Sequence, residues 1–226
     1  SIPEKMDDPA LPEEALTLAL SDIRKVNRYL GGHTTSLKGL RSLLDPDTNT
    51  PLHIIDMGCG DGEFLRVLAR HCRKMGVPVT LIGWDMNPKS LAMARRASAA
   101  FPEIRYECQD VLGACVLPEN SLITCNLFLH HFSSLEVSEL LSKWKDAGAS
   151  AVIINDLHRN ALAYYLFRLF GAIFMKSSVA RYDGAVSIRR GFRKGELLRI
   201  FEGLNASETS IRWYWAFRWL CCIRNT

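Results

Sequence analysis

Apolar residues follow two different periods along this chain. Five short runs rich in β-branched residues predict buried strands, at 52–56, 79–84, 104–108, 121–126 and 151–156. Three stretches between them repeat apolar residues every three or four positions, as amphipathic helices do: 63–75, 88–100 and 135–147. Because strands and helices alternate, we predict an α/β fold with a mostly parallel sheet and helices on both of its faces.

The beginning of the chain departs from this alternation. Residues 12–30 are predicted to form a helix that Gly31 and Gly32 close, and a second helix is predicted near 36–44. We interpret residues 1–48 as an N-terminal helical cap that covers one edge of the sheet.

The end of the chain also departs from it. After a helix near 193–203, the stretches SETSIRW and YWAFRWLCCIR have strand character and no helix between them, so we expect an antiparallel hairpin. With the five earlier strands this makes a seven-stranded sheet, in a main domain over 49–226.

Composition excludes some classes of function. The chain has 226 residues and 48% hydrophobic content, enough for one domain with a sizeable core. The formal net charge is +4, well below that of a dedicated nucleic-acid-binding protein, so we expect no nucleic-acid partner. The acidic, proline-rich first residues do not resemble a signal peptide.

The cysteines favour a reducing compartment. There are seven, an odd number, and no CxxC pair occurs. This pattern is typical of free thiols rather than of disulfides or a zinc site, so we expect a cytoplasmic location.

The segment 56–62, DMGCGDG, places glycine at every second position directly after the first predicted strand. Ligands of open parallel sheets bind beyond the carboxyl ends of the strands, where glycine lets a ligand approach the backbone. The dinucleotide fingerprint would need glycine at position 63, which is Glu63. Asp56 and Asp61 would repel phosphate but attract a positive group, such as the sulfonium of S-adenosylmethionine.

Here the chain resembles the class I S-adenosylmethionine-dependent methyltransferases, whose first motif is an acid followed by GxGxG. The order of predicted elements over residues 50–225 is also similar to that family, and it implies a Rossmann-like sheet. Two further segments, DIRKVNRYLGGH (22–33) and INDLHRNALAYYLFRLF (154–170), resemble a small-molecule branch of the family that is associated with type III polyketide synthases.

This resemblance implies S-adenosylmethionine as the cofactor and a set of residues that bind it. Asp85 would accept hydrogen bonds from both ribose hydroxyls, and Asp110 would accept from the adenine amino group. The complete implied set is Asp56, Gly58, Gly60, Gly62, Asp85, Met86, Asp110, Val111, Asn126 and Leu127.

Histidines after the fourth and fifth predicted strands are the candidate catalytic residues. His130 and His131 follow the fourth strand, and His158 follows the fifth. A phenol has an ordinary pKa of about 10, and histidine is the usual side chain that accepts its proton near neutral pH. We expect His158 to be the base, with Asp156 as an orienting carboxylate, and His131 to be the second candidate.

Other roles for these histidines stay open at this point. They could bind substrate, for which His130 is the candidate, cap a helix or fill the loop. Neighbouring histidines rarely point at one ion, and no further ligand motif accompanies His130 and His131, so we predict no metal.

The stretch after the fifth predicted strand is unusually apolar and then basic. Residues 161–175 would form a helix of about 22 Å, shorter than the roughly 30 Å core of a bilayer. Eight lysines and arginines lie between His158 and Gly195, against the single acid Asp183. This segment is either a core helix followed by a solvated loop or a lid over 159–192.

As a lid, this segment would hold a hydrophobic substrate through Arg159, Tyr164, Tyr165, Phe167 and Phe170. Its positive charge between 159 and 195 could also meet a membrane surface or an acidic carrier.

We therefore predict methyl transfer from S-adenosylmethionine to a small hydrophobic aromatic or polyketide-like metabolite, as O-methylation of a phenolic hydroxyl with a histidine base. The alternatives are C-methylation of a quinone-type precursor and a noncatalytic cofactor-binding or RNA-associated module.

Overall fold

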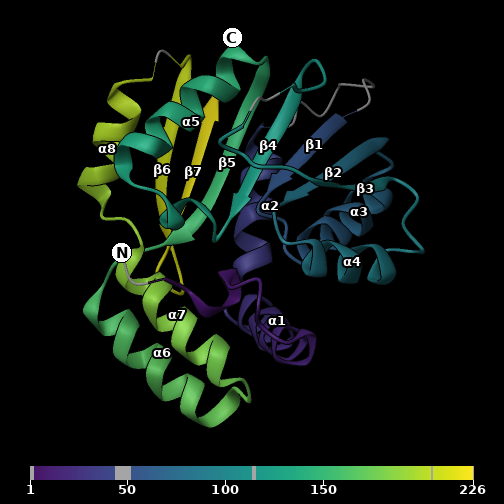
Figure 1. The fold of residues 1–226 in the computed structure, drawn as a ribbon. Coiled ribbons are helices and arrows are strands. Elements are labelled where there is room, and N and C mark those ends of the chain that lie inside the picture. The colour runs from purple at the N-terminus through teal and green to yellow at the C-terminus, as the bar shows by residue number, and fades with distance from the viewer. Residues whose placement is uncertain (1–2, 44–51, 114–115, 205, 226) are drawn as a thin grey trace.

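The fold is built on one twisted sheet of seven strands (Figure 1). The computed structural model describes residues 3–43, 52–113, 116–204 and 206–225. The strands are β1 (Leu52–Met57), β2 (Val79–Asp85), β3 (Ile104–Cys108), β4 (Ser121–Asn126), β5 (Ala149–Leu157), β6 (Glu208–Tyr214) and β7 (Arg218–Arg224). Their order across the sheet is β3-β2-β1-β4-β5-β7-β6.

The first five strands run parallel, and the last two form an antiparallel hairpin in which β7 lies between β5 and β6. The predicted sheet and hairpin are confirmed. All five early strands were located within two residues of their observed bounds, because fully buried parallel strands are apolar along their whole length.

Helices cover both faces of the sheet. They are α1 (Glu13–Tyr29), α2 (Gly32–Leu43), α3 (Glu63–Met75), α4 (Pro88–Ala97), α5 (Ser134–Asp146), α6 (Ala161–Phe174), α7 (Ser178–Arg190) and α8 (Lys194–Glu202), with the short 3-10 helices η1 (Lys5–Asp7) and η2 (Leu129–His131). Side chains of α5 and α8 form one hydrophobic cluster with the sheet, and those of α2, α3 and α4 form a second cluster on the opposite face.

Capping side chains set where two of these helices begin. The Asn87 side chain accepts hydrogen bonds from the first backbone N–H groups of α4, and Pro88 occupies its first position. Ser133 and Glu136 form a reciprocal capping box at the start of α5. α4 begins three residues after the end of β2, whereas η2 lies between the end of β4 and α5.

The leading helices differ from the prediction in two ways. Gly32 does not close α1 but begins α2, four residues before the predicted start, because only Gly31 has positive φ. The two helices also cover different parts of the sheet, since α2 packs on the interior strands β5 and β7, whereas α1 belongs to the layer beyond the carboxyl ends of the strands. The predicted boundary at 48/49 lies outside the described residues.

A separate helical layer lies beyond the carboxyl ends of the parallel strands (Figure 1). It contains α1, α6, α7 and η1, and α7 contacts each of the other three. Residues 178–190 are helical, so the alternative of a solvated loop after the apolar helix is wrong. No helix in the described part of the chain is long and apolar enough to cross a membrane.

Candidate active site

A cavity of about 960 Å³ lies between the carboxyl ends of the strands and the helical layer. Its floor comes from the loops after β1, β2, β3, β4 and β5, and its roof from η1, α1, α6 and α7. A parallel sheet binds its ligands at this edge. The volume is at the upper end of the range for small-molecule sites, so it has room for more than one small molecule.

The glycine turn lines one end of this cavity. Gly58 and Gly60 have φ of +69° and +54°, a region that favours glycine, and both line the cavity. Gly62 does not line it, because its Cα faces the Tyr106 side chain, where an added Cβ would lie 2.0 Å from the hydroxyl oxygen. The absence of a side chain at Gly62 therefore lets the turn pack closely against Tyr106.

Asp85 is tied to this turn through backbone groups. The N–H of Gly60 donates to Asp85 Oδ2 at 2.8 Å, and the N–H of Asn87 donates to Asp85 Oδ1 at 2.8 Å. A carboxylate has about four lone-pair positions, so two remain for a ligand in the cavity. Burial raises the pKa of Asp85 above its ordinary value. The remaining acceptors match the two ribose hydroxyls expected there.

Asp56 is buried beneath the turn. Its Oδ1 accepts hydrogen bonds from Thr124 Oγ1 at 2.6 Å and from Asn126 Nδ2 at 3.0 Å. Burial raises its pKa to about 7. Asp56 thus connects β1 to the end of β4, where Asn126 and Leu127 reach the cavity.

The other predicted cofactor residues also line the cavity. Asp110 holds the turn after β3 by accepting a hydrogen bond from the Leu112 N–H at 2.9 Å. Val111 is buried beside it, and Met86 is exposed at the cavity rim. This places an acceptor, an apolar wall and a thioether around one compartment, which suits a purine ring with an amino group.

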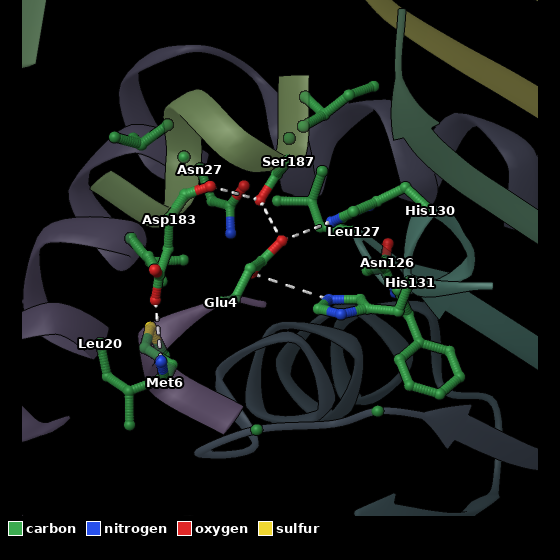
Figure 2. A pocket seen from close by; sticks show the side chains of 18 of the residues that line it. Glu4, Met6, Leu20, Asn27, Asn126, Leu127, His130, His131, Asp183 and Ser187 are labelled. Atoms are coloured by element: carbon green, nitrogen blue, oxygen red, sulfur yellow. Dashed lines mark hydrogen bonds and ion pairs between the residues drawn. The ribbon is translucent and has the colours of Figure 1, made fainter. Parts of the chain in front are cut away.

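On the side of the cavity where the methyl acceptor is expected, two buried carboxylates flank His130. Its Nδ1 lies 2.7 Å from Asp156 Oδ1. Its Nε2 lies 3.6 Å from Glu4 Oε1, a contact that Figure 2 shows. Burial would lower the pKa of His130, but the two carboxylates outweigh it and raise the pKa to about 9. His130 is therefore an imidazolium at neutral pH, and it cannot act as a general base there.

This arrangement corrects one prediction. Asp156 was expected to orient His158, but its carboxylate is bound to the ring and the backbone N–H of His130, and to the N–H of Leu157. β5 ends at Leu157, so His158 lies outside the strand. Its side chain therefore does not point in the same direction as that of Asp156.

His131 stacks on His130 with ring centroids 4.6 Å apart and lines the cavity. Its Nδ1 lies 3.5 Å from Asp7 and its Nε2 lies 3.9 Å from Glu4. Within the described residues, Glu4, His130 and His131 bring ligand atoms within 4.8 Å of one another, as a metal site would. Arg190 already places a cation 3.7 Å from Glu4, which disfavours an ion, and the absence of a metal stays a prediction.

His158 lines the cavity from the end of β5. Its ring packs against Trp219 and Phe217, at centroid distances of 5.0 and 6.5 Å. Its Nδ1 is buried without a hydrogen-bond partner, and burial lowers the pKa below its ordinary value. His158 is thus neutral near pH 7, the state that a general base requires.

Apolar side chains form the rest of the cavity wall on the side where the methyl acceptor is expected. From α1 and from the two helices of the predicted lid, the cavity is lined by Leu16, Leu20, Ile23, Val26, Ala163, Leu166, Phe167, Phe170, Ala180 and Ile188. These helices belong to different parts of the sequence, so only the folded chain closes this wall.

Three predicted substrate residues lie elsewhere. Arg159 forms a bidentate ion pair with Glu196 at 2.7 and 2.8 Å, and it does not line the cavity. Tyr164 and Tyr165 also lie outside the lining, because α6 turns its Ala163 and Phe167 side inward and a helix rotates about 100° per residue. Phe167 does line the cavity, as expected.

Two charged residues at this site carry little signal in the sequence and were not predicted. Glu4 is almost fully buried and accepts a hydrogen bond from Ser187 Oγ of α7 at 2.8 Å. Arg218 is also buried at the cavity wall, where its Nη2 donates to Asn27 Oδ1 at 3.0 Å. Glu4 has no local motif, but Arg218 directly before the apolar run 219–223 was a visible signal.

Known proteins resemble this chain in sequence and in fold. Residues 54–150 match the family model described as a methyltransferase domain. Over 96 residues the chain is 33% identical to the non-reducing polyketide synthase tazA of Aspergillus terreus, a match that covers 41% of this chain and 4% of the synthase. The chain thus spans only a small part of the length of the curated relatives it matches.

Two solved structures show the fold over most of the chain. Magnesium protoporphyrin IX methyltransferase from Synechocystis PCC 6803, with bound S-adenosylmethionine, superposes with a TM-score of 0.60 at 13% identity, covering 97% of this chain and 100% of that one. The CMeT domain of the citrinin polyketide synthase gives a TM-score of 0.60 at 14% identity, covering 84% of this chain and 50% of that one.

The chain therefore has the class I methyltransferase fold. Residues 54–150 are the part of it that matches the model of a methyltransferase domain.

Proposed function

We propose that this protein transfers the methyl group of S-adenosylmethionine to a phenolic hydroxyl of a small hydrophobic aromatic or polyketide-like metabolite. The observation that carries the proposal is one shared cavity. It joins the glycine turn and Asp85 to the neutral ring of His158 and to an apolar wall. A base and a hydrophobic pocket beside a cofactor site suit a phenol, which is apolar apart from the group to be methylated.

The residues of this chain would bind, orient and deprotonate the acceptor. When bound, the cofactor supplies an electrophilic methyl group, and a thioether remains after its transfer to the acceptor oxygen. His158 would take the hydroxyl proton on Nε2, since its Nδ1 is buried, as that oxygen becomes the nucleophile. The side chains of α1, α6 and α7 exclude water and align the aromatic ring, which is the main requirement of such a transfer.

His131 is the second candidate for the base. It lines the same cavity, and Glu4 and Asp7 lie beside its two ring nitrogens. The buried imidazolium of His130 has a positioning role instead, since it holds Glu4 and with it the N-terminal part of the roof.

C-methylation is the alternative reaction. It is favoured by the fold similarity to the CMeT domain of the citrinin polyketide synthase and by the match to tazA. An activated carbon next to a phenol would need the same apolar pocket, and the same base could remove the proton from the carbon or from the neighbouring hydroxyl.

Calorimetry followed by a transfer assay tests the proposal. We expect S-adenosylmethionine and S-adenosylhomocysteine to bind and NAD not to bind. A panel of phenols, quinone precursors and polyketide aromatics is then incubated with methyl-labelled cofactor, and the site of the label is read by NMR. Label on oxygen supports O-methylation, and label on carbon supports the alternative. Cofactor binding without transfer to any acceptor would favour a noncatalytic module.

A further inference from the structure

The outer side of α6 is an exposed apolar surface. Large apolar side chains project from it to solvent at the three- and four-residue spacing of one helix side: Leu162, Tyr165, Leu166, Leu169, Ile173 and Phe174. Tyr165 is 67% exposed and Ile173 is 65% exposed. Contiguous apolar side chains of this size on a folded protein mark an interaction site.

Positive charge surrounds this apolar side. The exposed basic residues of the two lid helices and their connection are Arg168, Lys176, Arg181 and Arg189. The single acid between residues 159 and 195 is Asp183, which is only 3% exposed and accepts hydrogen bonds from the backbone N–H groups of Lys5 and Met6. The solvent-facing charge of α6 and α7 is therefore entirely positive.

We infer that the outer side of α6, with the basic residues around it, is a docking surface for a lipid bilayer that contains anionic headgroups. An amphipathic helix with bulky apolar residues and flanking lysines and arginines binds in this way, with its axis in the plane of the interface. Anionic lipids attract basic segments close to the surface.

Charge and chemistry argue for this occupant over others. A second copy of the same surface would bring positive charge against positive charge without an exposed acid to pair it. Among the fourteen residues of α6, Arg168 and the two tyrosines are the only side chains that could form specific polar contacts with a protein. A helix of 14 residues is about 21 Å long, which fits a position along the bilayer surface rather than across it.

The same helix connects the proposed membrane surface to the cavity. Its inner residues Ala163, Phe167 and Phe170 line the cavity, and Leu166 both lines the cavity and is exposed to solvent. A hydrophobic acceptor dissolved in the bilayer would reach the site past α6 without crossing water. This route rests on the proposed function, whereas membrane docking does not.

Sedimentation with vesicles tests the docking surface. The whole chain is mixed with phosphatidylcholine vesicles that contain or lack 30% phosphatidylglycerol, at low and at high salt. We expect at least tenfold tighter binding to the anionic vesicles, weakened by salt because exposed charges are screened. The double variant Leu169→Glu/Ile173→Glu should lose at least tenfold in binding, and Arg168→Gln/Lys176→Gln should lose the preference for anionic lipid.

A matched control shows whether the loss of binding is specific to this surface or follows from replacing any exposed leucine by glutamate. Leu135 is 70% exposed and lies on α5, a helix that packs against the sheet and is not part of the helical layer (Figure 1). Leu135→Glu should therefore leave vesicle binding unchanged. Circular dichroism and cofactor calorimetry on each variant show that it is folded, and they report on the cofactor site independently of docking.

Three results would overturn the inference. One is the absence of vesicle binding, and another is equal binding to neutral and anionic vesicles. The third is a dimer in light scattering that Leu169→Glu/Ile173→Glu dissociates, which would assign the surface to a second copy.

Discussion

The imidazole of His130 and the carboxylate of Asp156 lie 2.7 Å apart, from Nδ1 to Oδ1, although 26 residues separate them in the chain. Both side chains are almost fully excluded from solvent. His130 also faces Glu4 (Figure 2). The pair of His130 and Asp156 therefore links the ends of β4 and β5 to the N-terminal part of the cavity roof.

This charge cluster predicts a loss of stability on the alkaline side of neutrality. The pKa of His130 is raised from 6.5 to about 9, so the proton stabilises the folded state fully below pH 6.5. We expect the free energy of unfolding to fall by up to about 3 kcal/mol as pH rises through 9, because a tenfold difference in proton affinity corresponds to about 1.4 kcal/mol. Urea unfolding between pH 6 and 10 measures this loss.

NMR titration of the His130 ring assigns that loss to the cluster. The midpoint should lie near 9 in the protein and lower in Glu4→Gln, because one of the two carboxylates is removed. Glu14→Gln, which changes an exposed acid in the first turn of α1, should leave the midpoint unchanged. A midpoint at or below 6.5 in the unsubstituted protein would contradict the structure.

Asp85→Asn should weaken the binding of S-adenosylmethionine by at least tenfold. The substitution removes the charge and one acceptor from a carboxylate that already receives the N–H groups of Gly60 and Asn87. Calorimetry gives the dissociation constants. Asp146→Asn, at the exposed end of α5, is the control and should bind as the unsubstituted protein does. Equal affinity for both variants would show that Asp85 does not contact the ribose.

His158→Gln should reduce turnover by about two orders of magnitude, the usual contribution of a general base, while cofactor affinity stays the same. Because burial lowers the pKa of His158, the acidic limb of the rate profile should lie below pH 6.5 and disappear in the variant. The profile of kcat/KM against pH measures this. If His131→Gln removes that limb and His158→Gln keeps it, the base is His131.

Gly62→Ala should destabilise the fold far more than Gly76→Ala. Both glycines have φ near +70°, so each substitution carries the left-handed penalty of about 1–2 kcal/mol. Only at Gly62 would the new Cβ meet another group, the Tyr106 hydroxyl at 2.0 Å, whereas nothing lies within 4 Å at Gly76. Urea unfolding of both variants isolates the steric part, and equal losses would refute the close contact.

The sequence was most informative where local chemistry decides the structure. The strands are apolar throughout because both faces of a parallel sheet are buried, so β1 to β5 could be located closely. The spacing of glycines after Asp56 predicted the turn, since positive φ at Gly58 and Gly60 is a local requirement. Nine of the ten predicted cofactor residues line the cavity, because they lie at or just after the carboxyl ends of β1 to β4. Their contacts with the cofactor stay a prediction.

Contacts between residues far apart in the chain could not be predicted from local sequence patterns. The partner of Asp156 is His130 rather than His158, because β4 and β5 lie side by side and their ends bring these two residues together. Glu4 enters the site only because η1 packs on α7. The misplaced tyrosines show the same limit, since the side of α6 that faces inward is set by α7 and not by the composition of α6.

By itself the sequence determined the alternation of strands and helices and the glycine turn, because each depends on residues close together in the chain. The tertiary structure decided which histidine carries a proton, which residues close the acceptor pocket and which side of α6 meets solvent. These properties depend on burial and on the field of distant charges, and both arise only when β4, β5, α7 and the N-terminal segment come together.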